Sequence, residues 1–147
     1  MNMLANRANN IIALEAEMMS WPEEFKSMPP VEHCFSPGAY ARTMLIPEGQ
    51  MIVGKMHRHE HLNIISYGDI SVSTYEGVVR FVGHNVFKSS PGVKRAVYAN
   101  KNTMWTTIHL TEETDLEKIE EEVIIKMGSQ EELDFISDMQ SMIGEVK

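Results

Sequence analysis

The 147-residue sequence contains one cysteine, Cys34. With a single cysteine an intramolecular disulfide is impossible, and such a chain suits a reducing compartment. A lone cysteine before a phenylalanine is more typical of a small buried apolar residue than of a nucleophile. We therefore expect Cys34 to lie in the core.

Long apolar runs are also missing. No stretch approaches the roughly 20 residues that a membrane span needs. Residues 1–20 are interrupted by Asn, Arg and Glu, so they lack the apolar region of a secretory signal. A cytoplasmic location without a membrane partner is the expectation.

The sequence has no cluster of basic residues. Residues 1–110 carry ten Lys or Arg and nine Asp or Glu, whereas residues 111–147 carry three Lys and twelve Asp or Glu. The net charge of −8 therefore comes from the C-terminal segment, where a solvated helical face accounts for it. A nucleic-acid partner is not expected, because such partners need a clustered basic surface. Gly-rich phosphate loops, a nucleophile elbow and a Cys-x-x-Cys motif are absent from the sequence too.

Three zones follow one another along the chain. Residues 1–30 combine an amphipathic helix at 3–20 with a proline-containing linker. Residues 31–110 change to short alternating apolar runs separated by turn residues, which is typical of a β-sandwich or small barrel. The predicted strands cover residues 40–46, 51–57, 62–67, 70–74, 78–82, 85–88, 94–99 and 103–110.

Residues 111–147 return to a helical pattern. Thr114, with Glu117 three residues later, forms the signature of a capping box and predicts the start of a helix. Gly128 then interrupts the pattern, and Ser129 predicts the start of a second helix.

Half of the six histidines fall within five residues, at His57, His59 and His61. On an extended strand these side chains and Asn63 would share one face, since alternate residues point the same way. Neighbours on that face stand roughly 6.6 Å apart, so two imidazoles can converge on one ion but a straight strand cannot present all three. Either the strand bends or one histidine has another role.

Imidazole is the commonest protein ligand for transition metals. The cluster therefore indicates a divalent metal site, with Fe, Ni, Mn, Cu or Zn as candidates. A metal-free polar pocket and ordinary surface histidines are the alternatives.

The pattern His57-x-His59-x3-Asn63 resembles the first motif of the cupin family, which reads His-x-His followed by Glu. The segment Pro91-Gly92-Val93-Lys94-Arg95 resembles the second motif, where a turn precedes a third His. The resemblance covers about residues 32–110. It implies a mainly β fold, an antiparallel jelly-roll barrel flanked here by N- and C-terminal helices, with a metal held by three His and one carboxylate.

The sequence departs from that family at the proposed metal ligands. Asn63 replaces the Glu, and Arg95 replaces the third His. Arginine cannot ligate a cation, and its charge would repel one. His61, His109 or Glu60 would have to complete an altered metal shell. Alternatively, the metal is lost and Arg95 binds a carboxylate or phosphate through its planar fork of donors, as a metal-free histidine-base site would allow.

Trp105, Thr107 and His109 alternate along the last predicted strand and so share a face. An aromatic ring, a hydroxyl and an imidazole make a reasonable wall for a small-molecule ligand. The alternative places Trp105 in the core and His109 at a frayed strand end.

Two functions follow. The first is a small cupin that binds a divalent metal, a small anionic ligand or both through the histidine cluster, with enzymatic activity left open. The second is a non-enzymatic accessory or virion-assembly protein whose terminal helices dock a partner, because the chain also resembles small cupin-like proteins of tailed bacteriophages. In that case it would lie in the host cytoplasm or the virion. A homodimer is expected, since exposed sheet edges and apolar helices favour two-fold pairing.

Overall fold

A computed structural model describes residues 10, 11, 13, 14, 17, 28–74, 77–126, 129–134 and 137. Its elements are β1 (Val31–Ser36), β2 (Ala39–Ile46), β3 (Met51–Val53), β4 (Met56–His57), β5 (His61–Thr74), β6 (Gly77–Val82), β7 (Asn85–Ser89), β8 (Ala96–His109), α3 (Leu116–Val123) and β9 (Ile124–Ile125). Within the described residues, no helix has the length and apolar character needed to cross a membrane.

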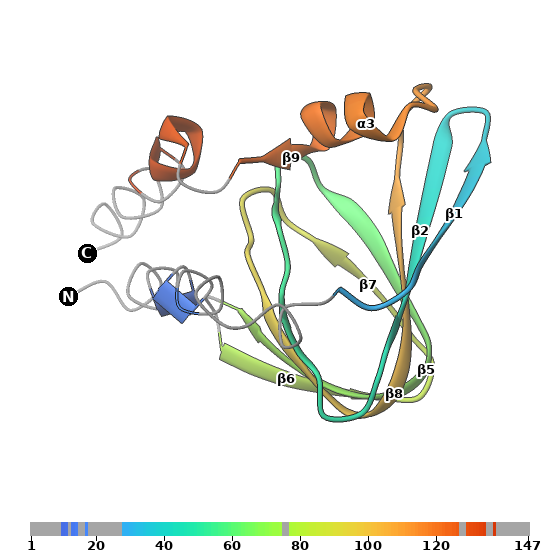
Figure 1. Cartoon of the computed structure of the whole chain (residues 1–147), viewed down its shortest axis with the longest axis vertical. Helices are drawn as coiled ribbons and strands as arrows, with labels where there is room; N and C mark the ends of the chain where they lie inside the picture. The colour runs from blue at the N-terminus through green and yellow to red at the C-terminus, as the bar shows by residue number, and fades with distance from the viewer. Residues whose placement is uncertain are drawn as a thin grey trace.

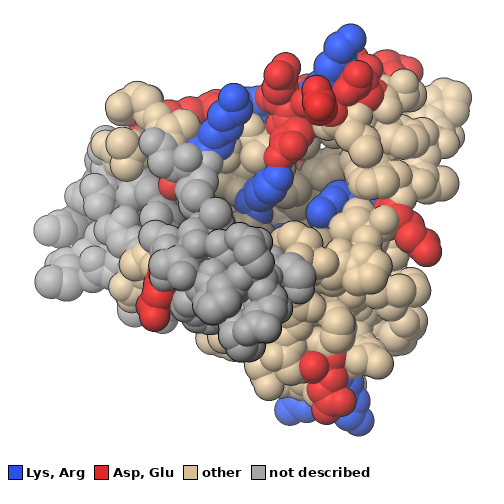
Figure 2. Space-filling model, viewed as in Figure 1, with Lys and Arg blue, Asp and Glu red and all other residues tan. Residues whose placement is uncertain are grey.

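The strands pair antiparallel, and the longest pair holds most of the others together. β5 and β8 have 14 residues each and pair from Leu62 with Ile108 to Ser73 with Ala96. One half of this ribbon is flanked by β7 and β2, and the other half by β6 and β3, while β1 extends β2. The ribbon bends between its halves (Figure 1), and the curled sheet encloses a hollow that opens in the space-filling view of Figure 2. The predicted antiparallel β-barrel is thus confirmed.

Some strand predictions need correction. Residues 62–67 and 70–74 form one continuous strand, β5, and the segments 94–99 and 103–110 contribute to another, β8. The predicted strand 51–57 is divided into β3 and β4, because the chain leaves the sheet between them. β1 was not predicted. Cys34 lies exposed on β1, so its predicted burial is wrong.

α3 begins one residue later than predicted. The Asp115 carboxylate, not the Thr114 hydroxyl, accepts hydrogen bonds from the backbone N–H groups of Glu117 and Lys118. This caps the first turn and places a negative charge at the positive end of the helix. In Figure 1, α3 and β9 lie across one end of the barrel.

The flanking helices are only partly described. Residues 130–134 are helical, in agreement with the helix predicted after Ser129, but its remainder lies largely outside the described residues, as does most of the predicted helix 3–20. The structure is of one chain, so the predicted homodimer and the docking role of these helices stay predictions.

Alternate residues of the strands fill the core. The largest buried cluster contains Ile46, Ile52, Ile65, Ile70, Val72, Val97, Ala99 and Trp105. Burial of each large aliphatic side chain is worth about 1.5–3 kcal/mol, so this cluster is a main source of stability.

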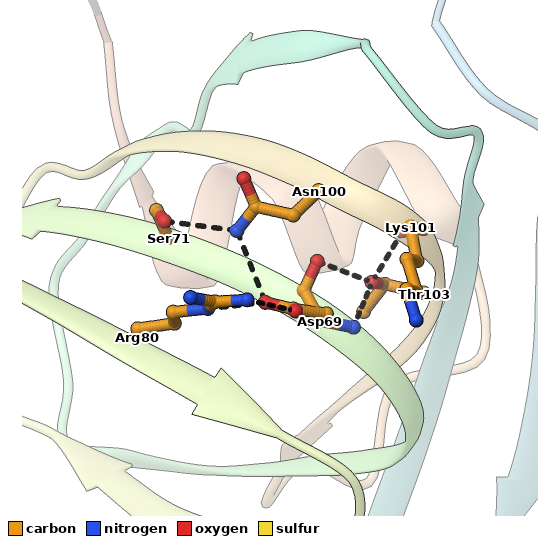
Figure 3. A network of polar contacts seen from close by, with 6 residues as sticks. All are labelled: Asp69, Ser71, Arg80, Asn100, Lys101 and Thr103. Carbon is orange, nitrogen blue, oxygen red and sulfur yellow. Dashed lines mark hydrogen bonds and ion pairs between the residues drawn. The ribbon is translucent and has the colours of Figure 1, made fainter.

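A polar network fixes the bend of the β5–β8 ribbon (Figure 3). The buried Asp69 carboxylate accepts hydrogen bonds from Arg80 Nε at 2.8 Å and Asn100 Nδ2 at 3.0 Å. Asn100 Nδ2 also donates to Ser71 Oγ at 3.0 Å. These bonds, led by those from Arg80, lower the pKa of Asp69 to about 2, so the carboxylate stays ionised. Buried polar groups of the bend are thereby satisfied.

Gly68 permits the close crossing of the two strands at this bend. Its φ is +127°, and a Cβ at this position would lie 2.6 Å from Thr103 Cα. Only glycine combines this backbone conformation with so close an approach.

We expect Gly68→Ala to destabilise the protein through both effects. Gly49→Ala is the matched control, because Gly49 also has a positive φ of +85° but no atom within 4 Å of the added Cβ. Since forced overpacking costs ~1–3 kcal/mol, Gly68→Ala should lower the free energy of unfolding by about 2 kcal/mol more than the control. Urea unfolding of the two variants measures this difference, and equal losses would show that the crossing is not tight.

Candidate functional site

The barrel contains a cavity of about 890 Å³ between the sheet and the segment formed by α3 and β9. Its size is that of a small-molecule site. Figure 2 shows its mouth, with basic side chains at the opening and acidic side chains of α3 above it. The acidic residues beside the cavity are Glu117, Glu120 and Glu121, all exposed.

The register of the strands arranges the cavity wall in layers. Tyr40 of β2 pairs with His109 of β8, and Arg42 pairs with Thr107. Met44 then pairs with Trp105. Because alternate residues face inward, all six side chains line the cavity and its polarity falls along the strands. The predicted face of Trp105, Thr107 and His109 thus lies inside the barrel.

Three imidazoles meet near the α3 end of the cavity. The ring centroids of His57 and His61 lie 4.2 Å apart, and the His109 ring lies 5.0 Å from His57 and 5.3 Å from His61. His57 ends β4 and His61 begins β5, and the chain bends at residues 58–59 between them. A bend was one of the two geometries expected for this cluster. His59 lies on the bend, is exposed and does not line the cavity.

Burial keeps these imidazoles neutral. Desolvation, followed by the neighbouring imidazoles and guanidinium groups, lowers the pKa of His57 to about 2 and that of His109 to about 4. Desolvation also lowers the pKa of His61. The His57 Nδ1 atom is buried without a hydrogen-bond partner among the described residues, while His61 Nδ1 lies 3.2 Å from the His59 carbonyl oxygen. A bound molecule can therefore find an unused polar atom at His57.

Arg95 places a positive charge beside the imidazoles. Its guanidinium carbon lies 5.6 Å from the centre of the Phe87 ring and 5.9 Å from that of Trp105, and Nη2 donates to Ser89 Oγ. Burial lowers the pKa of Arg95 to about 10, so the group stays cationic at neutral pH. The aromatic faces and the hydroxyl orient the guanidinium without neutralising its charge.

Arg42 is a second cation on the cavity wall, and it projects from β2 in the layer below His109. Within the described part of the chain, neither Arg42 nor Arg95 forms an ion pair. Both are half-buried. The cavity thus holds two guanidinium groups without a carboxylate partner among the residues that the structure describes.

Asn63, 1% exposed, is committed to a hydrogen-bond network in the cavity wall. Its Oδ1 accepts from Trp105 Nε1 at 3.1 Å, and its Nδ2 donates to Ser89 Oγ at 2.7 Å. Ser89 in turn contacts Arg95. The carbonyl oxygen that would have to replace the family's ligating carboxylate is therefore already bound to an indole N–H group.

These residues do not fit the metal centre that the resemblance implies. Among the residues described, no group of three or more His, Cys, Asp or Glu side chains is arranged to hold an ion. The Asn63 carbonyl oxygen, at the position of the family's ligating Glu, is bound to the indole of Trp105. Arg95 adds a nearby positive charge that opposes a cation.

Arg58, the residue between His57 and His59, holds the segment formed by α3 and β9, which covers the cavity. Its guanidinium donates to the carbonyl oxygens of Glu121 at 2.8 Å and Glu122 at 2.7 Å, and to the Glu131 carboxylate at 2.8 and 3.0 Å. Its backbone N–H donates to the Val123 carbonyl oxygen at 2.8 Å. α3 has no basic residue in its last turn, so Arg58 supplies the positive charge that a helix C-terminus favours.

Sequence reasoning missed Arg58, Arg42 and Tyr40 as parts of the site. Tyr40 Oη lies 2.6 Å from His33 Nδ1, and its ring stacks on His109 at 6.1 Å. Residues 40, 42 and 44 alternate within a strand that was predicted, so their common face was available from the sequence. The role of Arg58 was not, because its partners lie more than 60 residues away.

Comparisons with known proteins identify the architecture. No family model matches the sequence, and no curated protein matches it. A solved structure of an uncharacterised conserved protein with a double-stranded β-helix domain from Klebsiella pneumoniae is 11% identical, with a TM-score of 0.52 over 63% of this chain and 89% of that one. A cupin-2 domain containing protein from Shewanella frigidimarina is 7% identical, with a TM-score of 0.49 over 65% and 98% of the two chains. At such identities the likeness concerns the fold alone.

We expect Arg58→Met to loosen the cover of the cavity. Loss of its charged hydrogen bonds should lower the free energy of unfolding by about 1.5–3 kcal/mol and speed amide hydrogen exchange in α3. Lys55→Met is the control, because Lys55 pairs with Glu120 of the same helix but both side chains are more than half exposed. Such pairs contribute less than about 1 kcal/mol. Equal effects of the two variants would contradict the role of Arg58.

The buried imidazoles predict a loss of stability in mild acid. Their pKa values are lower in the folded chain than the ordinary 6.5, so the unfolded chain takes up protons first as the pH falls. The free energy of unfolding keeps its full value above pH 6.5. Below that pH it decreases by about 1.4 kcal/mol per pH unit for each such group. The carboxyl groups with lowered pKa values, Asp69 and Glu131, have ordinary values of 3.8 and 4.5, so most of the loss between pH 6.5 and pH 5.0 belongs to the imidazoles.

Urea unfolding at pH 7.5, 6.0 and 5.0 measures this slope. His109→Gln should flatten it, whereas His84→Gln, at an exposed histidine outside the cavity, should leave it unchanged. A slope that is the same in all three proteins would show that His109 is not the source.

Proposed function

We propose that the barrel of this chain, which has a double-stranded β-helix fold, binds a small organic anion. The observation that carries this proposal is the pair of guanidinium groups, at Arg42 and Arg95, that line the cavity without a carboxylate partner among the described residues. A partly buried charge is stabilised when a charge of opposite sign binds beside it. A bound carboxylate or phosphate would supply that charge.

Arg95 is the main anchor. Its guanidinium is held by two aromatic rings and the Ser89 hydroxyl, so less side-chain freedom is lost when it binds. Its planar fork can donate two parallel hydrogen bonds to one carboxylate. Ser89 is itself held by Asn63, so the replacement of the family's Glu by Asn63 serves to position Arg95.

The imidazoles act as neutral hydrogen-bonding groups in this proposal. With pKa values near 2 and 4, His57 and His109 are uncharged at neutral pH and would be weak proton acceptors. An anion bound nearby favours their charged form and raises these pKa values. Binding should therefore be accompanied by proton uptake and be tighter at pH 5.5 than at pH 7.5, provided that the protein stays folded.

The test is a set of anions with matched neutral compounds. Acetate, succinate, benzoate, hexanoate, gluconate and inorganic phosphate are titrated by calorimetry, with benzamide and hexanamide as uncharged counterparts. We expect at least one anion to bind and its amide not to. Arg95→Met keeps much of the side-chain volume but removes the charged donors, and should weaken binding at least tenfold, because charged hydrogen bonds contribute about 1.5–3 kcal/mol. Lys88→Met, at an exposed lysine outside the cavity, is the control.

Two outcomes contradict the proposal. One is a protein that binds none of these anions, or binds the amides equally well. The other is found by elemental analysis of tag-free protein: stoichiometric Fe, Ni, Mn, Cu or Zn that disappears in a His57→Ala/His61→Ala variant would identify a metal centre instead.

A further inference from the structure

The cavity is much larger than the group that its two cations can bind. A carboxylate occupies a small part of about 890 Å³. Below the layer of Arg42 and Thr107, the wall is formed by Met44, Trp105 and Ile46. The rest of the ligand must therefore lie against a different kind of surface from its charged group.

That surface, which we call the apolar floor, consists of Ile46, Ile52, Val97 and Trp105. All four line the cavity and belong to the main core cluster. They are buried, with exposed fractions of 3%, 7%, 8% and 9%. A hydroxyl placed against the aliphatic residues would lose its hydrogen bonds to water without replacement, whereas a hydrocarbon would be favoured there.

Trp105 lies at the boundary between the floor and the cations. Its ring faces the guanidinium group of Arg95, and its indole N–H group is bound to Asn63. The indole therefore offers an apolar surface but no further donor to a ligand. The polar and apolar parts of the cavity are thus adjacent, so a single small molecule can contact both.

From this division we propose that the ligand is a hydrophobic organic acid: one carboxylate bound by Arg95 and Arg42, and a hydrocarbon chain or ring packed on the apolar floor. This inference rests on the proposed function and narrows it to a chemical class. Polyhydroxylated acids of the same charge and carbon number are disfavoured.

The test is a homologous series of straight-chain carboxylates, acetate, butanoate, hexanoate and octanoate, titrated into the wild-type protein. Burial of a methylene is worth about 0.8 kcal/mol, which corresponds to about a fourfold gain in affinity for each added carbon until the floor is covered. Hexanoate should also bind at least tenfold more tightly than gluconate, which has six carbons and the same charge. The series needs no variant, so folding defects cannot imitate the result.

The outcomes separate the two proposals. If gluconate or succinate binds, Arg95→Met abolishes that binding and the carboxylate series shows no gain with length, the ligand class is wrong and the anion site stands. If no anion binds, both fail. If hexanol binds as tightly as hexanoate, the floor is a binding surface but the cations do not select the ligand, and the inference of an acid is overturned.

Discussion

The antiparallel ribbon of β5 and β8 is the constraint on which the rest of the structure depends. Both strands continue through the bend, so each contributes to two faces of the barrel. One half carries His61, Asn63 and His109 toward the cavity, and the other half provides much of the apolar core. The tight crossing at Gly68 and the Asp69 network hold the two halves at a fixed angle. The positions of the imidazoles in the cavity thus depend on the bend at Gly68 and Asp69, which lies at the other end of the barrel.

The sequence predicted the barrel well, because alternation of apolar and polar residues is a local signal. The prediction of strand ends failed where the residues at a bend within a strand have the composition of a turn. Gly68-Asp69 and Asn100-Lys101-Asn102 have the composition of hairpin loops, yet they lie inside continuous strands. β1 was not predicted because its residues are almost all exposed, so its sequence does not alternate between apolar and polar residues.

The site was only partly predictable, because its residues meet through the closure of the barrel. His57 and His61 were in view as a cluster, but the third imidazole of the group is His109, which the register of β5 with β8 brings beside His61. His59 has the motif position and lies outside the cavity. Spacing along one strand describes such a cluster poorly when the chain bends within it. Asn63 and Arg95, which stood out as departures from the family pattern, lie together through Ser89.

The neighbouring residues Lys94 and Arg95 show how differently this fold treats two cations. Lys94 is 1% exposed, and its ammonium group lies 3.3 Å from the Glu132 carboxylate, which is also buried. The fold therefore supplies a counter-ion for the cation that is fully removed from water, as a buried charge requires. For Arg95 it supplies aromatic rings and a hydroxyl, which orient the guanidinium but leave its charge available. The two neighbouring cations therefore differ: within the part of the chain that is described, Lys94 has a carboxylate partner, whereas Arg95, which lines the cavity, has none. An oriented cation without a counter-ion among the described residues is what the proposed anion site requires.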